Sequence, residues 1–127
     1  MIAVVDTSVL VDHLRGDPRA HALLEREARA GRELWSSVVV RTEVLAGMRC
    51  HEEAQTLALL DALSWQEVTV ELADAAGALA RSYLRSHPGV DVADYLVAAT
   101  AELLGGDLLT LNVKHFPMFA GLEPAYR

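Results

Sequence analysis

The sequence predicts a three-layer α/β/α sandwich built on a mainly parallel central sheet, in a single domain. Three observations support this prediction. The chain has 127 residues, which is the length of one ordinary domain. Short apolar runs alternate along it with longer helical patterns, and Gly or Pro separates them at single points. Because parallel strands need long crossover connections, this alternation favours a parallel sheet with helices on both faces.

The start of the chain predicts a buried strand that leads directly into a helix. Residues 2–5 form a short apolar run, and Asp6 follows it at once. Apolar residues then recur at helical spacing as far as Leu14. Asp17 followed by Pro18 is the usual start of a second helix. These patterns predict a helix over 17–30, a strand over 34–37, helices over 39–49 and 52–63, and a strand over 66–70.

Two long helices dominate the second half of the chain. An amphipathic stripe over 72–83 predicts a helix with one buried face. The pattern over 91–104 is apolar on nearly every side, so we expect that helix to be buried. A strand is predicted over 107–111, and a weak one near 122–125.

Composition narrows the classes of function. Eleven Lys and Arg against 18 Asp and Glu give a net charge of −7, which argues against a module that holds nucleic acid by neutralising phosphates alone. The single cysteine, Cys50, excludes an internal disulfide, and we expect a reducing, cytoplasmic setting. No apolar stretch approaches the roughly 18 residues of a membrane span. Zinc and nucleotide-binding motifs are absent from the sequence.

Three acidic residues stand where burial is expected, and a buried polar group is the informative observation. Asp6 ends the first strand, whereas Glu43 and Asp94 have mainly apolar neighbours one helical turn away. In parallel sheets, ligands bind outside the carboxyl ends of the strands. We therefore expect these three carboxylates to point into the interior or into a cleft at that edge.

Converging carboxylates need a positive partner, because burial penalises their charge and they repel one another. Hard oxygen ligands from separate elements are what Mg²⁺ or Mn²⁺ selects. Such an ion would activate water and offset negative charge on a phosphodiester. The sequence thus predicts a divalent-metal site that would let an acidic protein act on a polyanion.

Each of these acids also has a structural alternative. Asp6 could cap the helix that follows it. Asp91 and Asp94 have the spacing of a capping box, so Asp91 could be either a cap or a site residue. Glu43 could pair on the surface with a neighbouring arginine.

Small polar residues near the acids are candidates for orienting them. Thr7 and Ser8 directly follow Asp6, and we interpret them as supporting donors rather than nucleophiles. Thr110 and Asn112 point the same way from alternate strand positions, although Asn112 could equally be a turn residue.

Four segments in order resemble the motifs of PIN-domain ribonucleases, most closely the VapC-type toxins of toxin–antitoxin pairs. The resemblance runs from residue 1 to about residue 124, and four motifs together are far more specific than any one. The segments are residues 6–8 (Asp-Thr-Ser), 38–47 around Glu43, 91–100 around Asp94, and 109–116 with Asn112.

The resemblance implies an Mg²⁺-dependent endoribonuclease, with Mn²⁺ a plausible substitute, in which ion-activated water attacks an RNA phosphodiester. It assigns the metal site to Asp6, Glu43 and Asp94. Many family members have a fourth acid where this chain has Asn112, which leaves a second metal site open, with Asp91 a weaker substitute. Homodimers and a cognate antitoxin that covers the acidic cleft are also implied. Candidate cations for the RNA backbone are Arg15, Arg41, Arg49 and Lys114.

Two other functions compete with this interpretation. A PIN-like scaffold that has lost catalysis and only binds a partner would be consistent with an amide at Asn112. A phosphoacceptor receiver domain is also a short α/β chain, but it requires an adjacent acidic pair after the first strand. This chain has Asp6 followed by Thr7 there.

Overall fold

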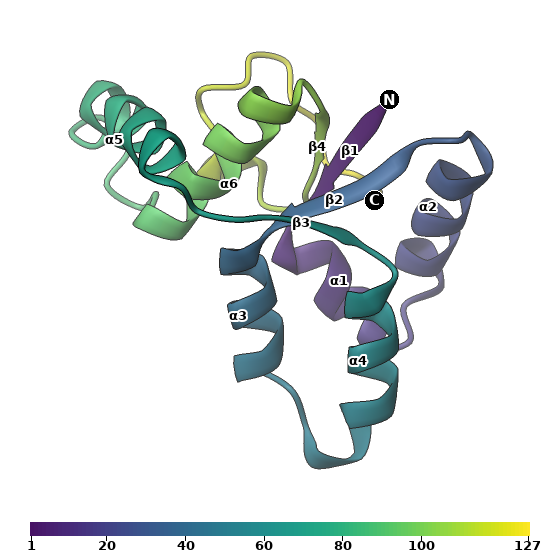
Figure 1. Cartoon of the computed structure of the whole chain (residues 1–127). Helices are drawn as coiled ribbons and strands as arrows, with labels where there is room; N and C mark the ends of the chain where they lie inside the picture. The colour runs from purple at the N-terminus through teal and green to yellow at the C-terminus, as the bar shows by residue number, and fades with distance from the viewer.

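The computed structural model describes residues 1–127, and its centre is a sheet of four parallel strands. The strand order is β3-β2-β1-β4, so β1 lies inside the sheet and pairs with both β2 and β4 (Figure 1). The apolar run at the start of the chain therefore becomes a central strand. The strands are β1 (Ile2–Val5), β2 (Glu33–Ser37), β3 (Ser64–Gln66) and β4 (Asp107–Leu109).

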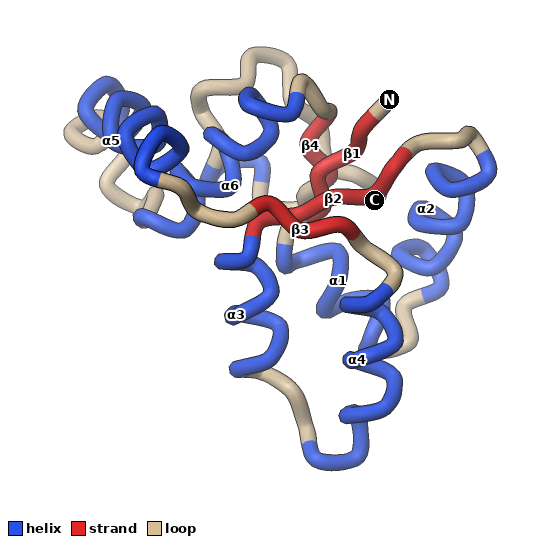
Figure 2. The backbone as a smooth tube through the Cα atoms, in the orientation of Figure 1, coloured by secondary structure: helices blue, strands red, loops and turns tan.

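Helices cover both faces of this sheet, which confirms the predicted three-layer sandwich. Figure 2 shows the first four helices on one side of the strands and the last two on the other. No helix combines the length and apolarity that crossing a bilayer requires. The helices are α1 (Thr7–Leu14), α2 (Pro18–Arg29), α3 (Val38–Ala46), α4 (Glu53–Asp61), α5 (Val70–Tyr83) and α6 (Val92–Leu104), with short 3₁₀ helices η1 (Cys50–Glu52) and η2 (Val113–His115).

The core is built around β1 and α6. Three of the four residues of β1 are completely buried, as expected for a strand covered on both faces. Six residues of α6, from Tyr95 to Ala101, are buried as well, which confirms the prediction of a buried helix. These two elements place the residues that follow β1 and the residues that begin α6 on a rigid support.

The connections reverse direction across β1. From β1 the chain adds β2 and then β3 toward one edge, and only afterwards returns to add β4 on the other side. The gap beyond the carboxyl ends of β1 and β4 is therefore a topological switch point, the place where open parallel sheets bind ligands. Asp6 directly follows β1 at this point.

Several predicted boundaries were wrong, each for a local reason. The strand predicted over 66–70 ends at Gln66, because Thr69 caps α5 by accepting a hydrogen bond from the Leu72 N–H at 3.1 Å. The helix predicted over 39–49 ends at Ala46, next to Gly47. No strand forms over 122–125, where the Leu122 N–H donates to the Phe119 carbonyl and the Ala125 N–H donates to the Thr110 carbonyl.

The approach of β4 to β1 gives a stability prediction. A Cβ at Gly106 would lie 2.9 Å from the backbone oxygen of Ile2, so Gly106→Ala should lower the free energy of unfolding by about 1–3 kcal/mol. Gly77, inside α5, has open space around it, and Gly77→Ala should raise that free energy by about 0.5–1 kcal/mol. Urea unfolding of both variants checks this, and a stabilising Gly106→Ala would contradict it.

Candidate active site

A cleft of about 460 Å³ opens beyond the carboxyl ends of β1 and β4. It is strongly acidic, because five carboxylates line it, and no arginine or lysine does. The three acids singled out from the sequence are thus brought together, although Asp6 precedes α1, Glu43 lies on α3 and Asp94 lies on α6. The lining residues are Asp6, Thr7, Ser8, Val11, Asp12, Glu43, Asp91, Asp94, Leu111, Asn112 and His115.

Asp6 is the most deeply placed of these acids, with 6% of its surface exposed. It occupies the N-cap position of α1, yet its side chain makes no capping hydrogen bond. Instead its Oδ2 accepts hydrogen bonds from the Thr110 hydroxyl at 2.7 Å and the Ser8 hydroxyl at 3.3 Å. The capping alternative for this side chain is therefore wrong, and Asp6 is held toward the cleft.

The two donors to Asp6 are themselves fixed by the backbone after β4. The Ser8 hydroxyl accepts from the Leu111 N–H at 3.1 Å, and the Thr110 hydroxyl accepts from the Asn112 N–H at 3.0 Å. Each hydroxyl thus has a donor on one side and the Asp6 carboxylate on the other. This chain of bonds locks the α1 start to the segment after β4.

Glu43 lies on the rim of the cleft rather than on an inward face. The buried residues of α3 are Val40 and Val44, whereas Glu43 is exposed, so the prediction of an inward-packed face was wrong by part of a helical turn. The surface-pairing alternative also fails, because the partner of Glu43 is a hydroxyl. The Thr7 hydroxyl donates to its Oε1 at 2.7 Å and turns the carboxylate toward α1.

Asp94 and Asp91 form a capping box at the start of α6 that also faces the cleft. Asp91 Oδ1 accepts from the Asp94 N–H, and Asp94 Oδ2 accepts from the Asp91 N–H, both at 3.1 Å. The cap proposed for Asp91 is confirmed, and both residues line the cleft as well. His115 approaches the same Asp94 oxygen, with its Nδ1 at 3.3 Å.

Burial raises the pKa of Asp94 from 3.8 to about 6. Loss of hydration is the largest cause, and the negative charges of Asp91 and Asp6 act in the same direction. The Asp91 N–H and His115 oppose the shift. Asp6 and Asp94 are therefore close enough to repel each other, which a bound cation would relieve.

A common pattern joins the three carboxylates. One oxygen of each is engaged by a protein donor, namely Oδ2 of Asp6, Oε1 of Glu43 and Oδ2 of Asp94. The other oxygen of each makes no hydrogen bond with the protein, so it is free to act as a ligand. Positioning of metal ligands by such outer donors is general in metalloproteins.

The oxygen donors of the cleft suit a hard divalent cation held at an open site. No three His, Cys, Asp or Glu side chains converge closely enough to make a complete ligand cage. Mg²⁺ is usually held by only one or two carboxylates, and waters and substrate phosphates complete its octahedron. The open, oxygen-lined cleft fits that kind of site and not a closed structural metal site.

The family of the chain follows from comparison with known proteins. Residues 3–120 match the family model described as the PIN domain. The chain belongs to the PIN-domain family. Among its relatives are Ribonuclease VapC19 of Mycobacterium tuberculosis, 49% identical over 97% of this chain and 98% of the relative, and Ribonuclease VapC10 of the same organism, 42% identical over 97% and 92%. This membership excludes the receiver-domain interpretation.

Solved structures share this PIN fold. A toxin–antitoxin complex from Klebsiella pneumoniae superposes with a TM-score of 0.78 at 24% identity and covers 98% of both chains. VapBC2 from Rickettsia felis, bound to a promoter DNA fragment, gives 0.75 at 23% identity over 96% of both chains. At these identities the likeness establishes the fold alone.

Sequence reasoning missed two residues that line the cleft of this PIN domain, Asp12 and His115. Asp12 lies one turn after Ser8 on α1, so the four-residue spacing would have placed both on one face. The Tyr126 hydroxyl donates to Asp12 Oδ2 at 2.6 Å, and the Arg19 guanidinium stacks on the Tyr126 ring at 5.1 Å. No local pattern predicts these contacts between the two ends of the chain.

Of the four cations proposed for RNA binding, only Lys114 lies next to the cleft. Arg15 forms an ion pair of 2.6 Å with Glu52, a buried carboxylate that is 5% exposed. Arg41 stacks over the Trp65 ring at 5.2 Å, and Arg49 lies beside Glu52. None of these three arginines lines the cleft, whereas Lys114 lines a hollow that adjoins it.

The raised pKa of Asp94 predicts a pH-dependent gain in stability on neutralising it. Folding penalises the carboxylate fully above about pH 6, and the penalty vanishes below 3.8, where the group is protonated in both states. In EDTA, Asp94→Asn should therefore melt at a higher temperature than the parent at pH 7.5, with the gain lost near pH 4. Calorimetry checks this against Asp74→Asn, a control at an exposed position of α5. A lower Tm for Asp94→Asn at pH 7.5 would contradict it.

Proposed function

We propose that this PIN-domain chain is a divalent-metal-dependent endoribonuclease, the toxin of a toxin–antitoxin pair that acts in the cytoplasm. The single observation that supports it best is the cleft at the switch point. There Asp6, Glu43 and Asp94 come from three separate elements, and each has one oxygen oriented by the protein and one left free. The 49% identity to a ribonuclease over 97% of this chain supports RNA as the substrate.

In this proposal Asp6 and Asp94 would hold the metal, Mg²⁺ or Mn²⁺, and Glu43 on the rim would supply a third carboxylate. When bound, the ion would supply Lewis-acid activation of water and would offset charge on the phosphodiester. Thr110 and Ser8 keep the Asp6 carboxylate in one orientation, and the capping box does the same for Asp94. Thr7 holds Glu43 toward the same space.

The chain has a neutral amide, Asn112, where many PIN-domain proteins have a fourth acid. Asn112 lines the cleft beside Asp6 and Asp94. We propose that it orients water or substrate instead of completing a second ion site. Asp91 is committed to capping α6 through the Asp94 N–H, which makes it a poor substitute ligand.

The proposed partners follow from the same reasoning. A PIN-domain toxin needs an inhibitor, and we propose a cognate antitoxin that covers the acidic cleft with a basic group. We also propose that the chain forms a homodimer. The fold likeness to toxin–antitoxin complexes supports the first of these proposals.

Loss of a proposed ligand should abolish cleavage without unfolding the protein. Removing an outer partner of a metal ligand typically costs about 10–100-fold in metal affinity or activity, so Asp6→Asn should cost more than about 100-fold. Thr110→Val, which removes the hydroxyl that donates to Asp6, should cost about 10–100-fold. Cleavage of single-stranded RNA with Mg²⁺, with Mn²⁺ and with EDTA checks this, with Asp74→Asn as an active control.

Two outcomes would contradict the proposal in different ways. Cleavage that resists EDTA would exclude the metal mechanism. A folded protein that cuts no RNA with either ion would favour the catalytically impaired scaffold, the alternative that Asn112 keeps open.

Expression in a bacterial host should arrest growth if the chain acts as a toxin. The parent should stop growth within a few generations, and Asp6→Asn at equal soluble levels should not. Co-expression of the proposed cognate antitoxin should restore growth of the parent strain. Normal growth with abundant soluble parent protein would be inconsistent with toxin action.

A further inference from the structure

A second hollow, of about 300 Å³, adjoins the acidic cleft. It is formed by the segment after β4 and by one residue of the C-terminal tail. Leu111, Asn112 and His115 line both spaces, so the hollow continues the cleft. The lining residues are Leu111, Asn112, Val113, Lys114, His115 and Pro124.

The electrostatics of the cleft make a neighbouring cation necessary for any polyanion. Five carboxylates line the cleft, and the net charge of the chain is −7. A cation in the cleft offsets charge at the reacting phosphate, but the phosphates on either side still meet a negative surface. Affinity for nucleic acid comes largely from Lys and Arg that neutralise phosphates. The substrate therefore needs positive charge just outside the cleft.

Lys114 is the side chain that meets this need. It is the only lysine of the chain, it is exposed, and it forms no ion pair. It is also the only Lys or Arg that lines either space. Other cations are engaged elsewhere in ion pairs, namely Arg15 with Glu52, Arg19 with Asp17, Arg29 with Glu25, and Arg32 with Glu27 and Asp107.

Asn112 adds a second free polar group at the boundary between the two spaces. Its backbone is fixed, because its N–H donates to the Thr110 hydroxyl and its carbonyl accepts from the His115 N–H at 2.9 Å. Its side-chain amide makes no hydrogen bond within the protein. Val113 and Pro124 supply apolar surface beside it, against which a nucleobase can pack.

From this arrangement we infer that the hollow is a subsite for the nucleotide next to the scissile phosphodiester of a single-stranded RNA. Lys114 binds the phosphate of that nucleotide, Asn112 contacts the strand where it leaves the cleft, and the apolar surface receives the base. This inference rests on the proposed ribonuclease function. It specifies the direction in which the strand leaves the cleft, across η2 rather than across α1.

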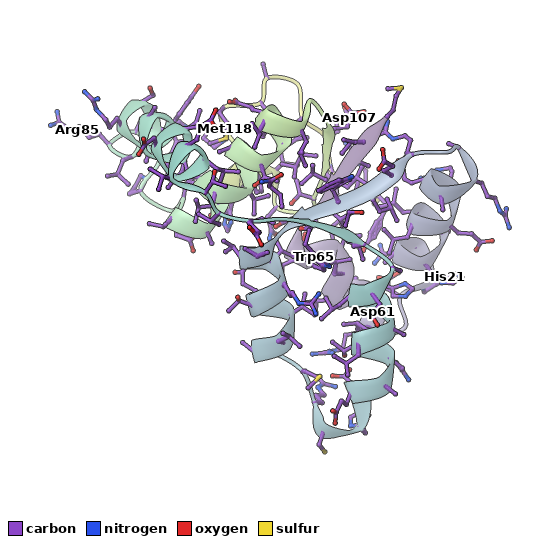
Figure 3. All side chains as sticks on the ribbon, in the orientation of Figure 1. His21, Asp61, Trp65, Arg85, Asp107 and Met118 are labelled. Carbon is purple, nitrogen blue, oxygen red and sulfur yellow. The ribbon has the colours of Figure 1, made fainter.

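The test compares Lys114→Ala with Arg85→Ala, a variant with the same change in charge. Figure 3 shows Arg85 beyond the end of α5, pointing away from the rest of the molecule, and Arg85 has no ion pair. Both variants are made in the Asp94→Asn background, so that the RNA should stay intact. The binding constant for a labelled single-stranded oligoribonucleotide is then measured in Mg²⁺ at a series of salt concentrations. Lys114→Ala should weaken binding several-fold and should reduce the slope of log K against log salt by about 0.7, the value for one phosphate contact on a single strand. Arg85→Ala should leave both unchanged.

Kinetics in the active background provide a second readout. Lys114→Ala should raise KM with kcat nearly unchanged, because a contact to a neighbouring phosphate binds ground state and transition state alike. Lys114→Arg should restore KM, since it restores the charge.

The outcomes separate failure of the subsite from failure of the proposed function. If Asp94→Asn is inactive but the Lys114 and Arg85 variants have equal salt slopes, the subsite is wrong and the proposed function stands. A drop in kcat at constant KM for Lys114→Ala would also overturn the subsite, because the lysine would then act on the reacting phosphate itself. If Asp94→Asn still cleaves RNA, the proposed function fails and the subsite with it.

Discussion

The hydrogen bond from the Thr110 hydroxyl to the Asp6 carboxylate is the contact on which the site depends. It joins residues 104 positions apart, it is buried, and it measures 2.7 Å. It can form only because β4 returns beside β1, on the side opposite to β2. The donated proton fixes one oxygen of Asp6 and leaves the other free. Without that strand order, Asp6 would be an ordinary residue at the start of a helix.

The same residues serve both stability and the proposed chemistry, and the two requirements conflict at Asp94. Its carboxylate caps α6 through the Asp91 N–H, which is a stabilising contact. Its burial beside Asp91 and Asp6 raises its pKa to about 6, so at neutral pH the folded protein carries a charge that it disfavours. A cation bound to the free oxygens would relieve this repulsion and would also stabilise the fold. If the chain holds a metal as proposed, metal binding and folding would be coupled.

The sequence predicted those parts of the fold and site whose signals are local. An apolar run before Asp6 and an apolar helix around Asp94 are unusual settings for acids, and both residues line the cleft. Glu43 was predicted on an inward face, but its position depends on a hydroxyl 36 residues away. The contact between Asp12 and Tyr126 spans 114 residues. Such tertiary contacts leave no trace in local periodicity. The Thr69 cap at the start of α5 is a local contact, but it also does not show in the apolar periodicity from which the strand was predicted.

The neutral residue at position 112 is consistent with the charge distribution around it. Lys114 forms no ion pair, and no carboxylate lines the hollow beside it. An aspartate at 112 would lie at the boundary between the cleft and the hollow, where it would repel the strand and attract the lysine. Asn112 keeps the hydrogen-bonding capacity of that position without the charge. In the proposed complex, a protein with a net charge of −7 would hold a polyanion by combining one metal ion in the cleft with Lys114 beside it.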